Sequence, residues 1–149
     1  MLTTHSIIVL ESLEESQSVR LASLRLANPE VISTCLIGEL DKVISESKSD
    51  TIHLVTRATI VSPDFYQLMK TTMEFSGCDF VTCKASILNT EKPCVVLVGE
   101  ANYEPSQVLV KRWVYQEMGV GQISAKDLIA KVIGEYRGSA IPSVLITKV

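Results

Sequence analysis

Apolar runs alternate with amphipathic segments along the chain. The runs consist largely of Val, Ile, Leu and Cys, which is typical of strands that are covered on both faces. They predict strands at residues 6–10, 31–37, 51–56, 79–87, 93–98 and 140–147. Residues 89–92 separate the fourth and fifth of these as a hairpin turn, so those two strands are expected to be antiparallel neighbours. Pro142 interrupts the last strand, which we therefore expect at an edge of the sheet.

Segments with helical spacing lie between the strands. They predict helices at residues 12–27, 40–44, 62–76 and 124–133, and a strand that turns into a helix over residues 108–118. The first helix stops at Asn28 and Pro29, and Gly77 and Gly119 follow the ends of two others. The helix that ends before Gly77 has the clearest apolar face, with aromatic, Leu and Met side chains.

Strands that alternate with helices favour one sheet between two layers of helices. The chain has 149 residues, which fits a single domain over residues 1–149. We therefore predict an α/β fold with three layers and a mixed sheet. The alternative is a Rossmann-like small-molecule binder with a wholly parallel sheet, and the hairpin turn at residues 89–92 argues against it.

Composition narrows the possible partners. The formal net charge of −3 gives no electrostatic footprint for nucleic acid or for an anionic membrane. The first apolar run is too short for a membrane span or a signal peptide, so we expect a cytoplasmic protein. The four cysteines lie mostly in apolar runs and are expected to be buried thiols. Neither they nor His5 and His53 have the spacing of a zinc site.

Residues 52–65, IHLVTRATIVSPDF, combine a buried strand, a short loop and a helix start. Ser62 offers a capping hydroxyl, Pro63 suits the first turn, and Asp64 places an acid beside the positive end of the helix. This segment resembles the metal-binding corner of family 2 glycosyltransferases, which have the GT-A fold. In that family, aspartates at the end of the strand hold a divalent metal on the diphosphate of the donor.

The resemblance extends over most of the chain. Residues 6–10 are similar to the first strand of the family, and residues 40–65 to the helix, strand and helix start around its metal motif. Residues 107–119 resemble the segment in which a basic pair opens a helix. Residues 124–128 and 141–145 resemble the acceptor-side helix and the closing strand. The resemblance implies a GT-A-like domain that is shortened relative to the family.

The chain departs from the family at the metal motif. The positions that match the aspartates are Thr56, Ala58 and Thr59. Hard cations such as Mg²⁺ and Mn²⁺ need oxygen ligands, preferably carboxylates, which neither a hydroxyl nor a methyl group replaces. We therefore expect no metal site and no cofactor. Mn²⁺ or Mg²⁺ is expected only if the chain transfers a sugar.

The resemblance also implies a set of site residues. Thr56, Ala58 and Asp64 occupy the corner and are candidates for substrate binding. Asp127 is the acid whose matching position suits a general base. Asp127 is also the fourth residue of a capping box that begins at Ser124, and we favour that structural role.

A second set of candidate substrate-binding residues is the basic and aromatic run Lys111, Arg112 and Trp113. A guanidinium offers donors in a fixed geometry to a diphosphate, and an indole stacks on the apolar face of a sugar. The structural alternative is a solvated basic pair beside a core tryptophan, and we favour that alternative.

Two classes of function remain. The favoured one is a degenerate glycosyltransferase-like domain that acts as a non-catalytic binding module or as a homo-oligomeric assembly module, with pairing through the last strand as the route to a dimer. The alternative is an active sugar transferase that uses a nucleotide-sugar donor, possibly without metal. Loss of the carboxylates removes charge stabilisation that a metal-dependent transfer needs, and this favours the first class.

Overall fold

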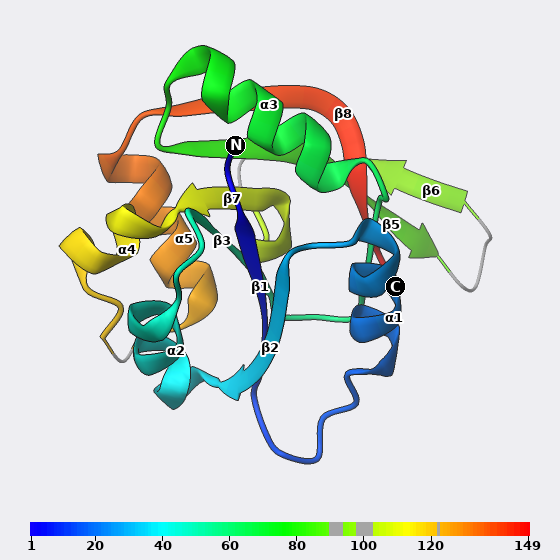
Figure 1. The fold of residues 1–149 in the computed structure, drawn as a ribbon. Helices are drawn as coiled ribbons and strands as arrows, with labels where there is room; N and C mark the ends of the chain where they lie inside the picture. The colour runs from blue at the N-terminus through cyan, green and yellow to red at the C-terminus, as the bar shows by residue number, and fades with distance from the viewer. Residues whose placement is uncertain (90–93, 98–102, 122) are drawn as a thin grey trace.

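The computed structural model describes residues 1–89, 94–97, 103–121 and 123–149 (Figure 1). Its strands are β1 Thr4–Leu10, β2 Val31–Leu36, β3 Thr51–Val55, β4 Thr59–Val61, β5 Phe80–Asn89, β6 Cys94–Leu97, β7 Val108–Lys111 and β8 Gly138–Lys148. Its helices are α1 Ser18–Ala27, α2 Leu40–Glu46, α3 Phe65–Ser76, α4 Arg112–Met118 and α5 Ala125–Glu135, with 3-10 turns η1 Ile37–Glu39 and η2 Pro105–Gln107.

The described strands form one mixed sheet in the order β2-β1-β3-β7-β5-β8-β4, and β6 pairs with β5 beside this path. β1 pairs in parallel with β2 and β3, and β5 pairs in parallel with β8. β7 runs antiparallel to both β3 and β5, and β4 runs antiparallel to β8. The prediction of a mixed sheet is confirmed, and the wholly parallel alternative is wrong.

Helices cover both faces of the sheet (Figure 1). α2, α4 and α5 pack on one face, against a cluster that includes Ile7 and Val9 of β1. α1 and α3 pack on the other face, against a cluster that includes Ile8 and Leu10. Successive side chains of a strand point to opposite faces, so the continuous apolar run of β1 supplies both cores. This confirms the three-layer α/β arrangement.

The first helix starts later than predicted. α1 begins at Ser18, and residues 11–17 form turns and bends, whereas the pattern predicts helix from residue 12. The carboxylate of Glu15 accepts a hydrogen bond from the backbone N–H of Glu11, and the N–H of Glu15 donates to the carbonyl of Ser12. Such local bonds compete with helical ones, so this segment folds as a loop.

The predicted hairpin joins β5 and β6, which are antiparallel with Asn89 opposite Cys94. The turn itself, at residues 90–93, lies outside the described residues. Two other details differ from prediction. β4 is a three-residue strand inside the segment predicted as a loop, and β8 is not an edge strand at its carboxyl end. Ile146–Lys148 pair with β5 on one side and with β4 on the other, because β4 closes the sheet there.

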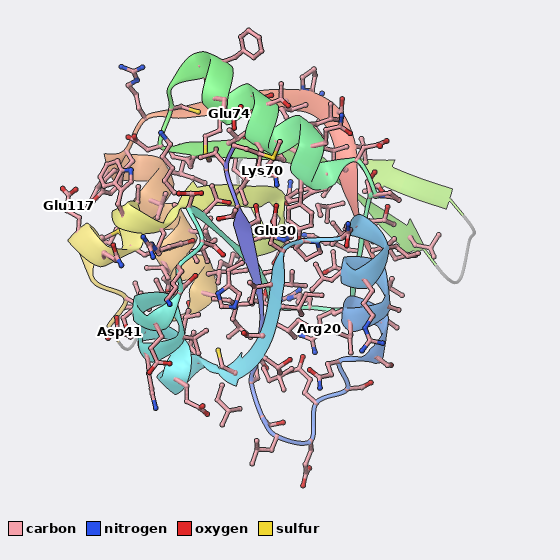
Figure 2. All side chains as sticks on the ribbon, in the orientation of Figure 1. Arg20, Glu30, Asp41, Lys70, Glu74 and Glu117 are labelled. Carbon is pink, nitrogen blue, oxygen red and sulfur yellow. The ribbon has the colours of Figure 1, made fainter. Side chains whose placement is uncertain are left out.

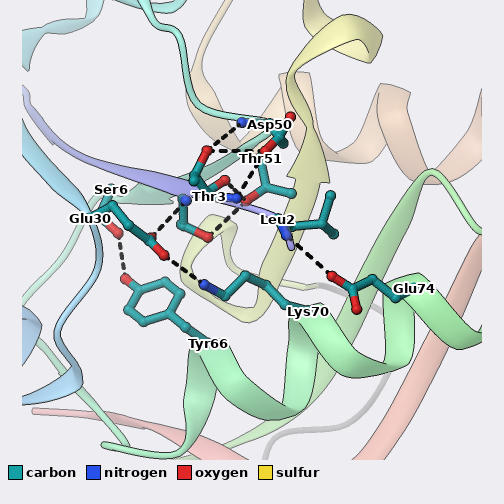
Figure 3. A network of polar contacts seen from close by, with 10 residues as sticks. Leu2, Thr3, Ser6, Glu30, Asp50, Thr51, Tyr66, Lys70 and Glu74 are labelled. Carbon is teal, nitrogen blue, oxygen red and sulfur yellow. Dashed lines mark hydrogen bonds and ion pairs between the residues drawn. The ribbon is translucent and has the colours of Figure 1, made fainter.

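The amino end of β1 is fixed by a network of polar contacts (Figure 3). The Asp50 carboxylate accepts from the N–H of Thr3 at 2.9 Å, and this bond lowers the pKa of Asp50. The Glu30 carboxylate accepts from the N–H of Thr4 at 2.8 Å and from the Lys70 ammonium at 2.9 Å. Burial alone would raise the pKa of Glu30, but these two partners lower it. The network ties β1 to α3 and to the start of β3.

The described cysteine side chains agree with the prediction of buried thiols. Cys35, Cys78 and Cys83 are buried and free, and burial raises the pKa of Cys35 to about 11 and that of Cys83 to about 12. The side chain of Cys94 lies outside the description. In the described parts of the chain, every helix is too short or too polar to cross a membrane.

Candidate functional site

An open cavity of about 350 Å³ lies at the carboxyl ends of β1 and β3. Its walls come from the end of β1, the residues that follow β3, and the start of α5. They are formed by Val9, Leu10, Glu11, Ile37, Thr56, Arg57, Glu104, Ile123, Ser124, Ala125 and Lys126. In open α/β sheets, ligands bind beyond the carboxyl ends of the strands, and the volume suits a small molecule.

Four charged side chains line this cavity, and they differ in how far their charges are compensated. Glu104 pairs with Lys148, with Oε1 and Nζ 3.1 Å apart, and both side chains are largely buried. Arg57 and Lys126 are exposed and have no ion-pair partner among the described residues. Two cations are therefore free to meet an anion in the cavity, opposed by Glu11.

The start of α5 adds backbone donors to the same wall. The Ser124 side chain accepts from the N–H of Asp127 at 3.2 Å, and its carbonyl accepts from the N–H of Leu128. The N–H groups of Ala125 and Lys126 make neither of these bonds, as is usual for the first turn of a helix. Both residues line the cavity at the positive end of the helix dipole, which favours a negative group.

The residues that match the aspartates of the metal motif do not form a divalent metal site. Thr56 lines the cavity, Ala58 is exposed and its carbonyl accepts from the N–H of Val149 at 3.2 Å, and the hydroxyl of Thr59 donates to the carbonyl of Arg57 at 2.7 Å. Within the part of the chain that the structure describes, no three His, Cys, Asp or Glu side chains cluster closely enough to hold a metal ion. The donor set therefore does not fit Mg²⁺ or Mn²⁺.

Asp127 and Asp64 do not line the cavity. Asp127 is exposed in the first turn of α5, directly after the residues that form the cavity wall. The backbone N–H of Asp127 completes half of the predicted capping box. Asp64 is exposed and precedes α3, on the face of the sheet that α1 and α3 cover. The two acids therefore belong to helices on opposite faces of the sheet.

Lys111, Arg112 and Trp113 lie at the other end of β3. Lys111 pairs with Thr51, the first residue of that strand, whereas the cavity lies beyond its last residue. The guanidinium of Arg112 donates to the carbonyl of Ser47. Trp113 is 43% exposed and stacks edge-on against Tyr136, with 5.9 Å between ring centroids. The structure thus separates this run from the cavity and from Thr56.

Several cavity residues escape sequence reasoning. Arg57 stands between Thr56 and Ala58, which match the metal motif, but that motif is defined by carboxylates and an arginine does not match it. Lys126 lies inside the capping box, which is defined by Ser124 and Asp127 on either side of it. Glu11 and Glu104 reach the cavity through the tertiary fold, and nothing in their local sequence signals this. The sequence does offer one signal for an anion site: a basic residue lies in each of two segments that resemble the family, Arg57 in the metal corner and Lys126 in the acceptor-side helix.

No protein-family model and no curated protein matches the chain. Solved structures do match it. TarS residues 1–349 from S. aureus match with a TM-score of 0.68 at 10% identity, over 98% of this chain and 60% of that one. The bifunctional IspDF from Campylobacter jejuni matches with a TM-score of 0.55 at 9% identity, over 95% of this chain and 50% of that one.

A third solved structure is that of CMP:2-keto-3-deoxy-manno-octonic acid synthetase in complex with CTP. It matches with a TM-score of 0.56 at 11% identity, over 95% of this chain and 90% of that one. At this level of identity the likeness concerns the fold alone. Together with the mixed sheet and its two helical layers, it shows that the chain has a GT-A-like α/β fold.

Proposed function

We propose that this GT-A-like domain binds a nucleotide or a nucleotide-sugar in the cavity beyond β1 and β3, without a divalent metal and without transferring the sugar. The observation that carries the proposal is the position of Arg57. It lies in the cavity wall next to Thr56, where the resemblance to family 2 glycosyltransferases implies carboxylates. A guanidinium binds phosphate oxygens directly and in a bidentate manner, so it can hold a diphosphate that carboxylates would hold through a metal.

Two further features support a phosphate-bearing ligand. Ser124, Ala125 and Lys126 at the start of α5 line the same wall, so the positive end of the helix dipole and a second cationic residue lie beside the cavity. One of the structures with a similar fold was solved with CTP. The apolar side chains of Val9, Leu10, Ile37 and Ile123 offer a surface for the less polar part of such a ligand.

The acids near the cavity favour binding over catalysis. A general base has to lie within hydrogen-bond reach of the acceptor hydroxyl, but Asp127, the acid to which the resemblance assigns this role, lies outside the cavity walls. Of the two acids in those walls, Glu104 is paired with Lys148, and Glu11 has no counterpart among the acids that the resemblance implies. The alternative is an active sugar transferase that works without metal, with Asp127 as its base. It would require Asp127 to turn toward the bound donor.

Homo-oligomeric assembly is the other non-catalytic role. Edge-to-edge pairing through the last strand needs unpaired backbone groups, and Ile146–Lys148 are paired on both sides. This stretch is therefore closed to a second copy, whereas residues 138–144 of the same strand have β5 as their one described strand partner.

A thermal-shift panel of nucleotides and nucleotide-sugars, each with Mn²⁺ and with a chelator, tests the proposal. A ligand that binds only the folded state stabilises it by about 2.7 kcal/mol at roughly 100 times its Kd. For a domain of this size that corresponds to an increase in Tm of roughly 5 to 10 °C. We expect at least one ligand to produce such a shift equally with Mn²⁺ and with the chelator.

Arg57→Ala and Lys126→Ala are expected to weaken that ligand roughly tenfold each, because each removes a charged hydrogen-bond donor. Arg25→Ala and Lys131→Ala are matched controls, since these residues are exposed on α1 and α5 away from the cavity walls and should leave the affinity unchanged. A shift that needs Mn²⁺ would favour the transferase alternative. No shift with any ligand would contradict the binding proposal.

A further inference from the structure

The loop between β1 and α1 is held by the carboxylate of Glu15. One oxygen, Oε2, accepts from the backbone N–H of Glu11 at 2.8 Å. The other, Oε1, accepts from Nη2 of Arg20 at 2.9 Å. Glu11 is part of the cavity wall. A single carboxylate therefore bridges a backbone donor at the cavity and a guanidinium behind it.

Arg20 has more donors than the structure uses. Its side chain is 1% exposed, and Nη2 donates to Glu15 and to the carbonyl of Ser16. Nε and Nη1 are buried and have no hydrogen-bond partner among the described residues. Buried donors without a partner cost free energy, and a guanidinium offers five N–H groups in one plane. The spare donors of Arg20 suit an additional oxyanion.

The position of α1 directs Arg20 toward the cavity end of the sheet. Ser23, three residues further along α1, donates its hydroxyl to the carbonyl of Thr59 at 3.0 Å. Residues three apart share a face of a helix, so Arg20 lies on the face of α1 that packs against the start of β4. Figure 2 shows Arg20 on the side of the sheet that α1 covers.

We propose that the Arg20 guanidinium and the Glu11 N–H form an anion subsite beside the cavity, next to its wall residue Glu11, and that Glu15 occupies this subsite until a phosphate group of a ligand displaces it. This inference rests on the proposed function and assigns the place of one phosphate group of the ligand, in addition to the contact proposed for Arg57. A carboxylate and a phosphate present similar pairs of oxygens to these two donors, and the phosphate has a further oxygen for the unused nitrogens of Arg20.

Displacement of Glu15 is compatible with its surroundings. Its side chain is 29% exposed, and residues 11–17 form neither a helix nor a strand, so its rotation breaks the hydrogen bonds with Glu11 and Arg20 but no regular element. A released carboxylate gains hydration, and the phosphate replaces its contact with Arg20. Glu15 therefore acts as an internal competitor that lowers the affinity of the cavity for anions.

Titration of Glu15→Gln with inorganic pyrophosphate by calorimetry tests this role. The amide keeps an oxygen acceptor but carries no charge, so it competes less well for the guanidinium. We expect pyrophosphate to bind Glu15→Gln about tenfold more tightly than wild type, a difference of about 1.4 kcal/mol. Glu14→Gln is the matched control, because Glu14 is exposed in the same loop and its replacement changes the net charge equally.

Arg20→Gln, when it is combined with Glu15→Gln, is expected to abolish the increase in pyrophosphate affinity. Arg25→Gln on the same helix should preserve that increase. Thermal unfolding without ligand shows whether the Arg20 variants are folded. Equal pyrophosphate affinity of the Glu15→Gln and Glu14→Gln proteins, or no binding by either, would overturn the inference.

This result is separable from the test of the proposed function. If wild type binds a nucleotide but Glu15→Gln does not bind pyrophosphate more tightly, the proposed binding cavity is supported and the role of Glu15 is contradicted. If Glu15→Gln binds pyrophosphate more tightly but no nucleotide binds, the anion subsite is supported and the nucleotide ligand is contradicted.

Discussion

His53 is a fully buried imidazole whose partners define its tautomer. Nε2 lies 2.7 Å from the carbonyl oxygen of Ser106, which can only accept, so Nε2 carries the proton. Nδ1 therefore accepts from the hydroxyl of Tyr66 at 2.8 Å, and the Tyr66 oxygen accepts in turn from the hydroxyl of Ser6. This chain of side chains joins β1, β3 and α3 with each member satisfied, as burial of polar groups requires.

Tyr66→Phe tests this hydrogen-bonded chain. The substitution keeps the ring but removes the donor to His53 and the acceptor for Ser6, so we expect the free energy of unfolding to fall by about 1 to 2 kcal/mol. Urea denaturation at pH 7 measures it. Tyr136→Phe is the control, because Tyr136 is only partly buried, and we expect a change within about 0.5 kcal/mol. Equal stability of the two variants would argue against the chain.

At the scale of elements, the sequence predicts best the strands that are buried on both faces. β1 and β3 are buried along their whole length because each faces two helical layers, and both contain mostly apolar residues in their carboxyl halves. β4 has three residues, and the sequence around it shows no pattern that marks a strand. Its formation depends on pairing with β8, almost ninety positions further along the chain. The predicted helix does not form over residues 12–17 because Glu15 bonds locally, and periodicity does not report such a bond.

The candidate site is predicted less completely than the fold. The resemblance leads to Thr56, which lines the cavity, but also to Lys111, Arg112 and Trp113 at the opposite end of β3. β7 runs antiparallel to β3, and this direction places its last residues beside the first residues of β3. Local sequence does not fix the direction of a strand. The cavity is formed by the ends of several strands, so its residues can be identified only when the order and direction of the strands are known. The hydrophobic pattern of the sequence does not give that order or direction.

The pairing of β5 with β8 makes Gly138 a sensitive position. Gly138 lies opposite Phe80, and a Cβ atom at Gly138 would overlap the buried ring of Phe80. The ring is packed in the core with α4 and α5, so it has little room to move. We expect Gly138→Ala to lower the free energy of unfolding by about 1 to 3 kcal/mol, as measured by urea denaturation.

Gly134→Ala is the matched control and should change stability in the opposite direction. Gly134 lies within α5, is exposed, and a Cβ atom there meets nothing within 4 Å. Alanine in a helix is more stable than glycine by about 0.5 to 1 kcal/mol. If both substitutions stabilised the protein, the close approach of Gly138 to Phe80 would be wrong.

On the scale of the whole molecule, the two ends of β1 have different roles. The amino end is closed by the contacts of Thr3 and Thr4 with Asp50 and Glu30 (Figure 3). The carboxyl end opens into the cavity, where Glu11 is bound by Glu15. A rigid strand that is anchored at one end can present donors at the other with little loss of entropy on binding. The fold thus favours a preorganised site beyond β1.

Stability of the whole molecule is expected to fall with acid. Burial lowers the pKa of His53 to about 4 and also lowers that of His5. The unfolded chain takes up protons on both imidazoles below about pH 6.5, whereas the folded protein takes them up only at lower pH. Their contribution to stability is therefore present above pH 6.5 and falls below it, for His53 until the pH reaches about 4. The pKa values of Glu30 and Asp50 are also lowered, so the loss of folding stability continues at lower pH as these carboxylates take up protons.

For His53 alone, the loss between pH 7 and pH 4.5 amounts to about 2 kcal/mol. Urea denaturation at pH 7, 5.5 and 4.5 at constant ionic strength measures it. In His53→Gln, which does not titrate in this range, we expect lower stability at pH 7 but a smaller dependence on pH. A flat profile for wild type, or an imidazole of His53 that titrates near pH 6.5 by NMR, would mean that the ring is open to solvent. The chain from Ser6 through Tyr66 would then be broken in solution.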